Sequence, residues 1–229
     1  MKRFWKEVAL DADRGMLLDG RPVRTPGRAP LALPTAALAE AVADEWRAVE
    51  ETLDPRAMPL TGLANAAIDR IAPDPAPYAA DIARYAETDL TCYRADSPAP
   101  LVERQRAAWD PLLDWARQRY DVNFETTAGV MHVAQPQATL ERLAEAVAAR
   151  DPFTLAALQV IVSATGSIVG TLALAEGAID AETLWRAAQV DEDWQAEQWG
   201  EDELAKQARE AKRASFDAAA RFLLALRRD

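Results

Sequence analysis

The sequence predicts an α+β protein in which a small antiparallel β-containing domain, residues 1–57, precedes a larger all-α helical-bundle domain, residues 58–229. Two features predict this order. A turn signal, Asp19-Gly20, lies between short apolar runs near the N-terminus, and from Thr35 onward apolar residues recur with the period of a helix. With 50% hydrophobic and 28% charged residues, the chain has the composition of a compact globular protein.

The N-terminal residues follow the pattern of short strands separated by turns. The runs RFWKEVAL, MLL and RPVRT are strand-like, and Asp19-Gly20 lies between the second and the third. An Asp-Gly pair tolerates the positive backbone angles of a tight hairpin turn. A small antiparallel β unit is therefore predicted here.

A helix is predicted to begin at Thr35, because threonine is suited to cap a helix N-terminus. Leu38, Val42 and Trp46 repeat on one helical face, and Pro55 ends the pattern. Helical starts and stops then continue to the C-terminus, so the rest of the chain is predicted to be a helical bundle. The further predicted helices span residues 61–71, 78–90, 101–120, 138–150, 152–175, 181–199 and 202–227.

One segment departs from the helical pattern. Residues 123–133, with the sequence NFETTAGVMHV, are rich in β-branched and aromatic residues, which favour extended structure. We interpret the segment 123–134 as a strand that returns to the N-terminal β unit.

A second segment, Phe153–Ala175, is uncharged and long enough to span a bilayer. Polar residues and glycines interrupt it, among them Gln159, Thr165 and Gly166. We therefore predict a buried central helix with a break near Gly166 rather than a membrane span.

The charge of the chain limits its partners. The formal net charge is −11 and the pI is about 4.7, whereas binding to nucleic acid or to an anionic membrane relies on clustered Lys and Arg. A basic or apolar protein partner fits better. A cytoplasmic location is expected, because Cys92 has no second cysteine to pair with and the N-terminal MKRFWKE carries no apolar signal region.

No pattern of catalytic, metal-binding or cofactor-binding residues stands out. His132 is the only histidine, so a catalytic triad has no base beyond it, and Cys92 fits a small core residue. One His and one Cys are too few to hold a metal ion by these ligands. The nine glycines form no phosphate-binding motif. We expect no cofactor, no metal and no enzymatic activity, although two carboxylates could still serve a hydrolase.

The acidic segment, Asp191–Glu203, is the most unusual part of the sequence. It holds seven acidic residues and two tryptophans without Lys or Arg. In one account Glu192 and Gln195 form hydrogen bonds inside the bundle; in the other they belong to a partner surface, with tryptophan supplying buried area. The basic stretch that follows, 206–213, either pairs with this segment or forms a solvated face. On a single helix 181–199, one face would carry Trp185, Ala188, Glu192, Gln195 and Trp199.

Several motifs resemble one known family over nearly the whole chain. They are, in order, RFWK, LDGRPVRTP, LALP, EW, MPLTGLANAAIDR, TDLTCYRA, RQRAAWDPLLDW and DEDWQAEQWGED. Together they resemble the ATP synthase F1 complex assembly factor 2 family. The resemblance implies a β-containing N-terminal domain, a helical C-terminal domain and a chaperone that does not hydrolyse ATP. It implies that the partner is the unassembled F1-ATPase alpha subunit, whose beta-facing surface the chaperone shields until the alpha-beta hexamer forms.

The resemblance also implies a site, because an acidic residue in the helical region of the family is tied to function and Glu192 matches its position. Glu192, Gln195 and Trp199, with Trp185 and Asp191 beside them, become the candidate partner-binding residues. They either contact the alpha subunit or hold the contact surface in shape. A monomeric bacterial relative is expected, and a carboxylate-dependent hydrolase and a general protein-interaction adaptor are the alternatives.

Overall fold

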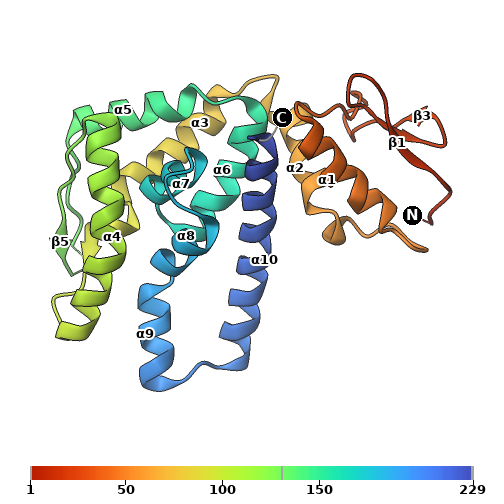
Figure 1. Ribbon diagram of the computed structural model, residues 1–229. Helices are drawn as coiled ribbons and strands as arrows, with labels where there is room; N and C mark the ends of the chain where they lie inside the picture. The colour runs from red at the N-terminus through yellow and green to blue at the C-terminus, as the bar shows by residue number, and fades with distance from the viewer. Residues whose placement is uncertain (1, 130, 228–229) are drawn as a thin grey trace. The chain divides into compact units, whose positions relative to one another are not determined.

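The computed structural model describes residues 2–129 and 131–227. It confirms the α+β class, because a three-stranded antiparallel sheet near the N-terminus is followed by a series of helices (Figure 1). The chain forms two compact units, each built from more than one stretch of sequence. The first unit comprises Met1–Pro75, Asp151–Ala157 and Ser215–Asp229, and the second comprises Ala76–Arg150 and Leu158–Ala214.

The predicted hairpin forms the sheet of the first unit. Asp19 and Gly20 both have positive φ, 48° and 75°, as the Asp-Gly signal requires. The Asp19 carboxylate accepts hydrogen bonds from the backbone N–H groups of Lys6 and Glu7, at 3.0 and 2.8 Å, so the turn is fastened to the chain that leads into the first strand. The strands are β1 (Val8–Leu10), β2 (Met16–Leu18) and β3 (Arg21–Pro22), paired in that order.

The helix predicted from Thr35 is α1 (Ala36–Arg47). The Thr35 hydroxyl accepts a hydrogen bond of 3.2 Å from the backbone N–H of Leu38, which confirms Thr35 as the N-cap. Leu38, Val42 and Trp46 are buried, as their spacing predicts.

The predicted end of this helix is wrong, because α1 stops at Arg47 and does not run to Pro55. The chain after it pairs with the N-terminus instead. The backbone N–H of Arg3 donates to the carbonyl of Glu51 at 2.8 Å, and the Arg3 guanidinium donates to the carbonyl of Val49 at 2.5 Å. These long-range bonds hold the segment extended, although its apolar spacing continues the helical period.

The next helix, α2 (Pro59–Ala66), begins two residues before the predicted Thr61. Its start is set by Glu45, whose carboxylate accepts hydrogen bonds of 2.8 Å from the N–H groups of Leu60 and Thr61 and one of 2.7 Å from the Thr61 hydroxyl. A carboxylate at a helix N-terminus satisfies N–H groups that have no partner within the helix. The other helical turns of the first unit are the 3-10 turn η1 (Pro55–Ala57) and the π-helical η2 (Ala67–Ile71).

The second unit is helical apart from one short strand pair. The helix predicted over 78–90 is a short α-helix followed by 3-10 turns. Two helices, α6 (Pro152–Thr165) and α10 (Glu203–Leu226), contribute residues to both units. The other elements are α3 (Ala76–Ala83), η3 (Arg84–Thr88), η4 (Leu90–Cys92), β4 (Tyr93–Arg94), α4 (Ala99–Tyr120), β5 (Thr127–Ala128), α5 (Gln137–Ala148), α7 (Ile168–Ala175), α8 (Ala181–Ala188) and α9 (Val190–Trp199).

The extended segment predicted at 123–134 does contain a strand, but its predicted pairing is wrong. β5 pairs in parallel with β4 of the second unit and not with the N-terminal sheet. The Thr139 hydroxyl donates to the carbonyl of Asn123 at 2.6 Å, and the backbone N–H of Gly129 donates to the carbonyl of Arg94 at 2.8 Å. Both bonds keep the segment within the helical unit. Residue 130 of this segment lies outside the described residues.

The predicted break near Gly166 is confirmed. Gly166 has a φ of 66° between α6 and α7, and the Ser167 hydroxyl then caps α7 by accepting a hydrogen bond of 3.0 Å from the N–H of Gly170. Among the described residues, no helix is long and apolar enough to cross a bilayer.

Asp89, from a distant part of the chain, forms hydrogen bonds with residues at the break between α6 and α7. Its carboxylate is completely buried and accepts hydrogen bonds from the Ser167 hydroxyl at 3.1 Å and from the Val169 N–H at 3.0 Å. Thr91 donates two more, from its N–H at 2.9 Å and its hydroxyl at 2.7 Å. Burial raises the pKa of Asp89, and the four hydrogen bonds oppose that rise.

The first unit is larger than the predicted N-terminal domain, because residues 58–75 and two later stretches belong to it. Residues 58–75 include α2, which Glu45 of α1 caps. The prediction that residues 1–57 fold as a domain of their own concerns independent folding, and it stays a prediction.

Candidate partner-binding surface

The acidic segment of the sequence forms α9 and the turn into α10 (Figure 1). Glu192, Gln195 and Trp199 share one face of α9, which we call the α9 outer face, and all three are exposed. The Trp199 side chain has an exposed fraction of 78%. Gly200, with a φ of 79°, ends the helix.

The single helix predicted over 181–199 is wrong, because it is broken at Gln189 into α8 and α9. The break separates Trp185 from the α9 outer face. Trp185 is 6% exposed, and the Arg213 guanidinium lies over its ring at 5.1 Å. The predicted stripe therefore divides into a buried part on α8 and an exposed part on α9.

Glu192 and Gln195 are exposed, so the account in which they form hydrogen bonds inside the bundle does not hold. It is Asp191 and Asp193 that face neighbouring helices. The Gln105 side-chain amide of α4 donates to the Asp191 carboxylate at 2.7 Å, and the Gln105 carbonyl oxygen accepts from the backbone N–H of Ala95 at 2.7 Å. Gln105 is 2% exposed, so this link is a buried one on the α4 side.

Arg104, next to Gln105 on α4, holds α9 further along its length. Its guanidinium forms an ion pair of 2.8 Å with Glu197 and lies 5.0 Å from the ring centre of Trp194. Cation–π contacts favour such stacking of Arg on tryptophan. Both contacts lie on the side of α9 that faces α4.

α10 holds α9 from a second direction. Arg209 forms an ion pair with Asp193 and a longer one of 3.7 Å with Glu201. Of the two alternatives for the basic stretch 206–213, a solvated face and local pairing with the acidic segment, Arg209 follows the second.

Polar contacts are prominent among those that hold α9, and none of its residues is buried. Most helices of globular proteins are held by an apolar face. Here Gln105, Arg104 and Arg209 take that role, and the α9 outer face is left exposed. A surface positioned in this way can meet a partner without rearrangement of an apolar core.

An apolar groove of about 670 Å³ lies beside this surface, between α4 and the α8–α9 pair. Its lining includes the apolar side chains of Leu112, Trp115 and Val190 and the charged side chains of Arg104 and Glu197. Sequence reasoning missed the groove, because Leu112 and Trp115 fit ordinary core positions. In the structure Trp115 is only half-buried, and the sequence pattern carries no sign of this.

The cysteine and the histidine of the sequence lie elsewhere. His132 is exposed, with its Nδ1 3.2 Å from the Tyr93 hydroxyl, and burial raises the pKa of the Cys92 thiol to about 12. Within residues 2–129 and 131–227, no group of three or more His, Cys, Asp and Glu side chains is arranged to hold a metal ion.

Known proteins match both the sequence and the fold. A family model described as ATP12 chaperone protein matches residues 2–117, just over half of the 229 residues. The solved structure of Atp12 from Paracoccus denitrificans has 43% identity and a TM-score of 0.92, with 98% of each chain covered. A mutant of that protein has 44% identity and a TM-score of 0.93, with 98% of this chain and 97% of that one covered.

A third solved structure, of an Agrobacterium tumefaciens protein assigned as a chaperone, has 44% identity and a TM-score of 0.91, with 98% of this chain and 86% of that one covered. The fold and these matches define the class of protein as a chaperone. More narrowly, the chain belongs to the ATP12 chaperone family. This confirms the resemblance to the F1 assembly factor family that the sequence motifs carry.

Proposed function

We propose that this chaperone binds the unassembled F1-ATPase alpha subunit and shields its beta-facing surface until the alpha-beta hexamer of ATP synthase forms. Membership of the ATP12 family supports this proposal. The observation that carries it is the exposure of Trp199, at 78%, on an acidic helix whose inner side is held by polar contacts. An exposed tryptophan can supply a large apolar contact area to a partner, and tryptophan is enriched among the residues that dominate binding energy at interfaces.

The mechanism is surface substitution. An alpha subunit without beta exposes an apolar interface that promotes aggregation, and a chaperone that covers this interface keeps the subunit available. On our proposal, Glu192, Gln195 and Trp199 contact the alpha subunit, while Asp191 positions α9 through Gln105. Trp185 is buried on α8 with Arg213 over its ring, and on our proposal it makes no direct contact with the alpha subunit. Beta then displaces the chaperone, because its interface with alpha is the tighter one.

We further propose that the chaperone acts as a monomer in the bacterial cytoplasm, with no cofactor and no catalytic turnover. Surface substitution requires no covalent step, so release needs only beta and no ATP.

Light scattering during refolding of the alpha subunit tests this proposal. The chaperone should suppress scattering at a 1:1 ratio, and addition of beta should release assembled alpha-beta without ATP. Unchanged aggregation of alpha would contradict the proposed function, and a strict need for ATP would contradict the proposed release.

A further inference from the structure

The turn from α9 to α10 carries two large apolar side chains in solvent. Trp199, the last residue of α9, and Leu204, in the first turn of α10, each have an exposed fraction of 78%. We call residues 199–204 the α9–α10 turn. Two exposed apolar side chains on one short turn offer more area to a partner than the α9 outer face alone.

The surroundings of this turn are strongly acidic. Residues 190–205 contain seven Asp and Glu and no Lys or Arg. Ion pairs with Arg104 and Arg209 involve Asp193, Glu197 and Glu201. Within the described part of the chain, no ion pair involves the other acidic side chains near the turn: Asp191, Glu192, Asp202 and Glu203.

Several contacts brace the turn. The Asp202 carboxylate accepts hydrogen bonds of 2.9 Å from the N–H groups of both Leu204 and Ala205, which caps α10. Arg209 links Glu201 to Asp193 across the turn. A surface fixed before binding loses little conformational entropy when a partner docks.

We propose that the α9–α10 turn docks a basic segment of the partner that carries large apolar side chains, with Trp199 and Leu204 as anchors and the acidic side chains as its electrostatic complement. This inference rests on the proposed function, since it names the chemistry of the partner segment. The charge of the turn argues against a second copy as the occupant, because two such turns would bring like charges together.

Fluorescence anisotropy of two labelled peptides tests this inference without the alpha subunit. One is an amphipathic peptide of leucine and lysine, and the other has glutamate in place of lysine. The full chain is compared with a double variant, Trp199→Ala with Leu204→Ala, and with Phe4→Ala. Phe4 is a suitable control because its exposed fraction of 69% is similar and it belongs to the first unit. Circular dichroism verifies that each variant is folded.

We expect the full chain and Phe4→Ala to bind the leucine-lysine peptide alike, and the double variant to bind it about tenfold or more weakly. The double variant keeps every charge, so a purely electrostatic attraction would leave its affinity unchanged. Unchanged affinity of the double variant would overturn the inference. So would a full chain that does not bind the leucine-lysine peptide, or one that binds the glutamate peptide equally well.

A parallel titration with refolded alpha subunit separates this inference from the proposed function. If the full chain fails to bind alpha, the proposed function fails, while the peptide experiment still decides the chemistry of the turn. If alpha binds the double variant as tightly as the full chain, the inference fails, and with it the contact that the proposed function assigns to Trp199, while the binding of alpha by the chaperone stands.

Discussion

The side-chain amide of Gln105 on α4 donates a hydrogen bond of 2.7 Å to the carboxylate of Asp191, in the first turn of α9. The bond links a residue that is 2% exposed to a helix that has no buried residue. It therefore connects the core of the second unit to the surface proposed for the partner. The orientation of the α9 outer face depends on this bond and on two arginines.

Replacement of Gln105 by Ala should loosen α9. The change leaves the N–H of Ala95 without its acceptor and Asp191 without its donor, at a cost of about 1–3 kcal/mol. Hydrogen exchange should show faster amide exchange in α9, and urea unfolding should show the loss of stability. Gln137→Ala is the control, because Gln137 is exposed and its side chain donates a hydrogen bond to Glu141 on the same helix. Equal exchange in α9 for both variants would contradict the role of Gln105.

Reversal of the charge at Arg209 should also free α9, because Arg209→Asp places an acid beside Asp193 and Glu201. The Arg209 and Asp193 side chains are 30% and 41% exposed, so the pair contributes only about 0.5–1 kcal/mol and weakens with salt. Combination with Asp193→Arg should restore slow exchange in α9. If the double variant exchanged as fast as Arg209→Asp alone, the ion pair would not be the cause.

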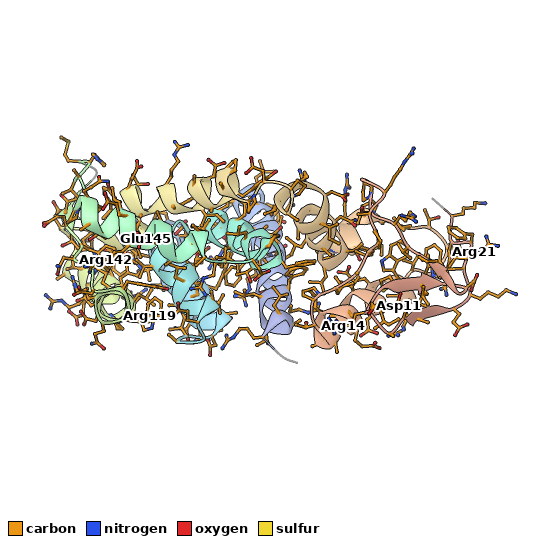
Figure 2. The ribbon with its side chains drawn as sticks, turned by 90° about the horizontal axis from the view of Figure 1, so that it is seen from above. Asp11, Arg14, Arg21, Arg119, Arg142 and Glu145 are labelled. Atoms are coloured by element: carbon orange, nitrogen blue, oxygen red, sulfur yellow. The ribbon has the colours of Figure 1, made fainter. Side chains whose placement is uncertain are left out.

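Glu176 should make stability depend on pH. Burial alone would raise its pKa, but hydrogen bonds from Arg119, Tyr120 and Arg150 outweigh burial and hold the pKa below the ordinary 4.5. Figure 2 labels Arg119, which lies in the last turn of α4. Because the folded-state pKa is lowered, its stabilising contribution is present above pH 4.5 and is lost as pH falls through the folded pKa.

The test compares the free energy of unfolding of the full chain and of Glu176→Gln between pH 3 and pH 7. The gap between them should be about 1–3 kcal/mol near pH 7 and should narrow in acid. A difference in the free energy of unfolding that grows as the pH falls would contradict the proposed stabilisation by ionised Glu176.

Cys92 should be unreactive in the folded chain. It is buried, and burial raises the pKa of its thiol to about 12, so little thiolate exists near pH 8. A thiol reagent such as DTNB should label it slowly in buffer and quickly in urea, by at least about a hundredfold. Rapid labelling of the folded chain would contradict this burial.

Local signals in the sequence predicted part of the fold. Asp19-Gly20, Thr35 and Gly166 each act through their own backbone or side-chain chemistry, so the hairpin, the start of α1 and the break between α6 and α7 follow from them. The end of α1 and the pairing of β5 depend on bonds to distant residues, Arg3 and Arg94, which a local pattern does not contain.

The candidate site was less accessible from the sequence. Gln189 breaks the helix before α9 without a Gly or Pro to signal it. Acidic residues occur on all sides of α9, so no apolar stripe indicates that Asp191 and Asp193 face its neighbours while Glu192 faces solvent. The turn between α9 and α10 was predicted, since the predicted helices end at residue 199 and begin at residue 202, but no local pattern marked Leu204 as an exposed side chain.

Co-elution of the chaperone with freshly refolded alpha subunit in size-exclusion chromatography tests the central claim most directly. Glu192→Lys is compared with Glu145→Lys, which reverses an exposed acid on α5, labelled in Figure 2. We expect the full chain and Glu145→Lys to form a 1:1 complex with alpha, and beta to dissociate that complex. Glu192→Lys should form no such complex. No complex with the full chain, or an equally stable one with Glu192→Lys, would contradict the account.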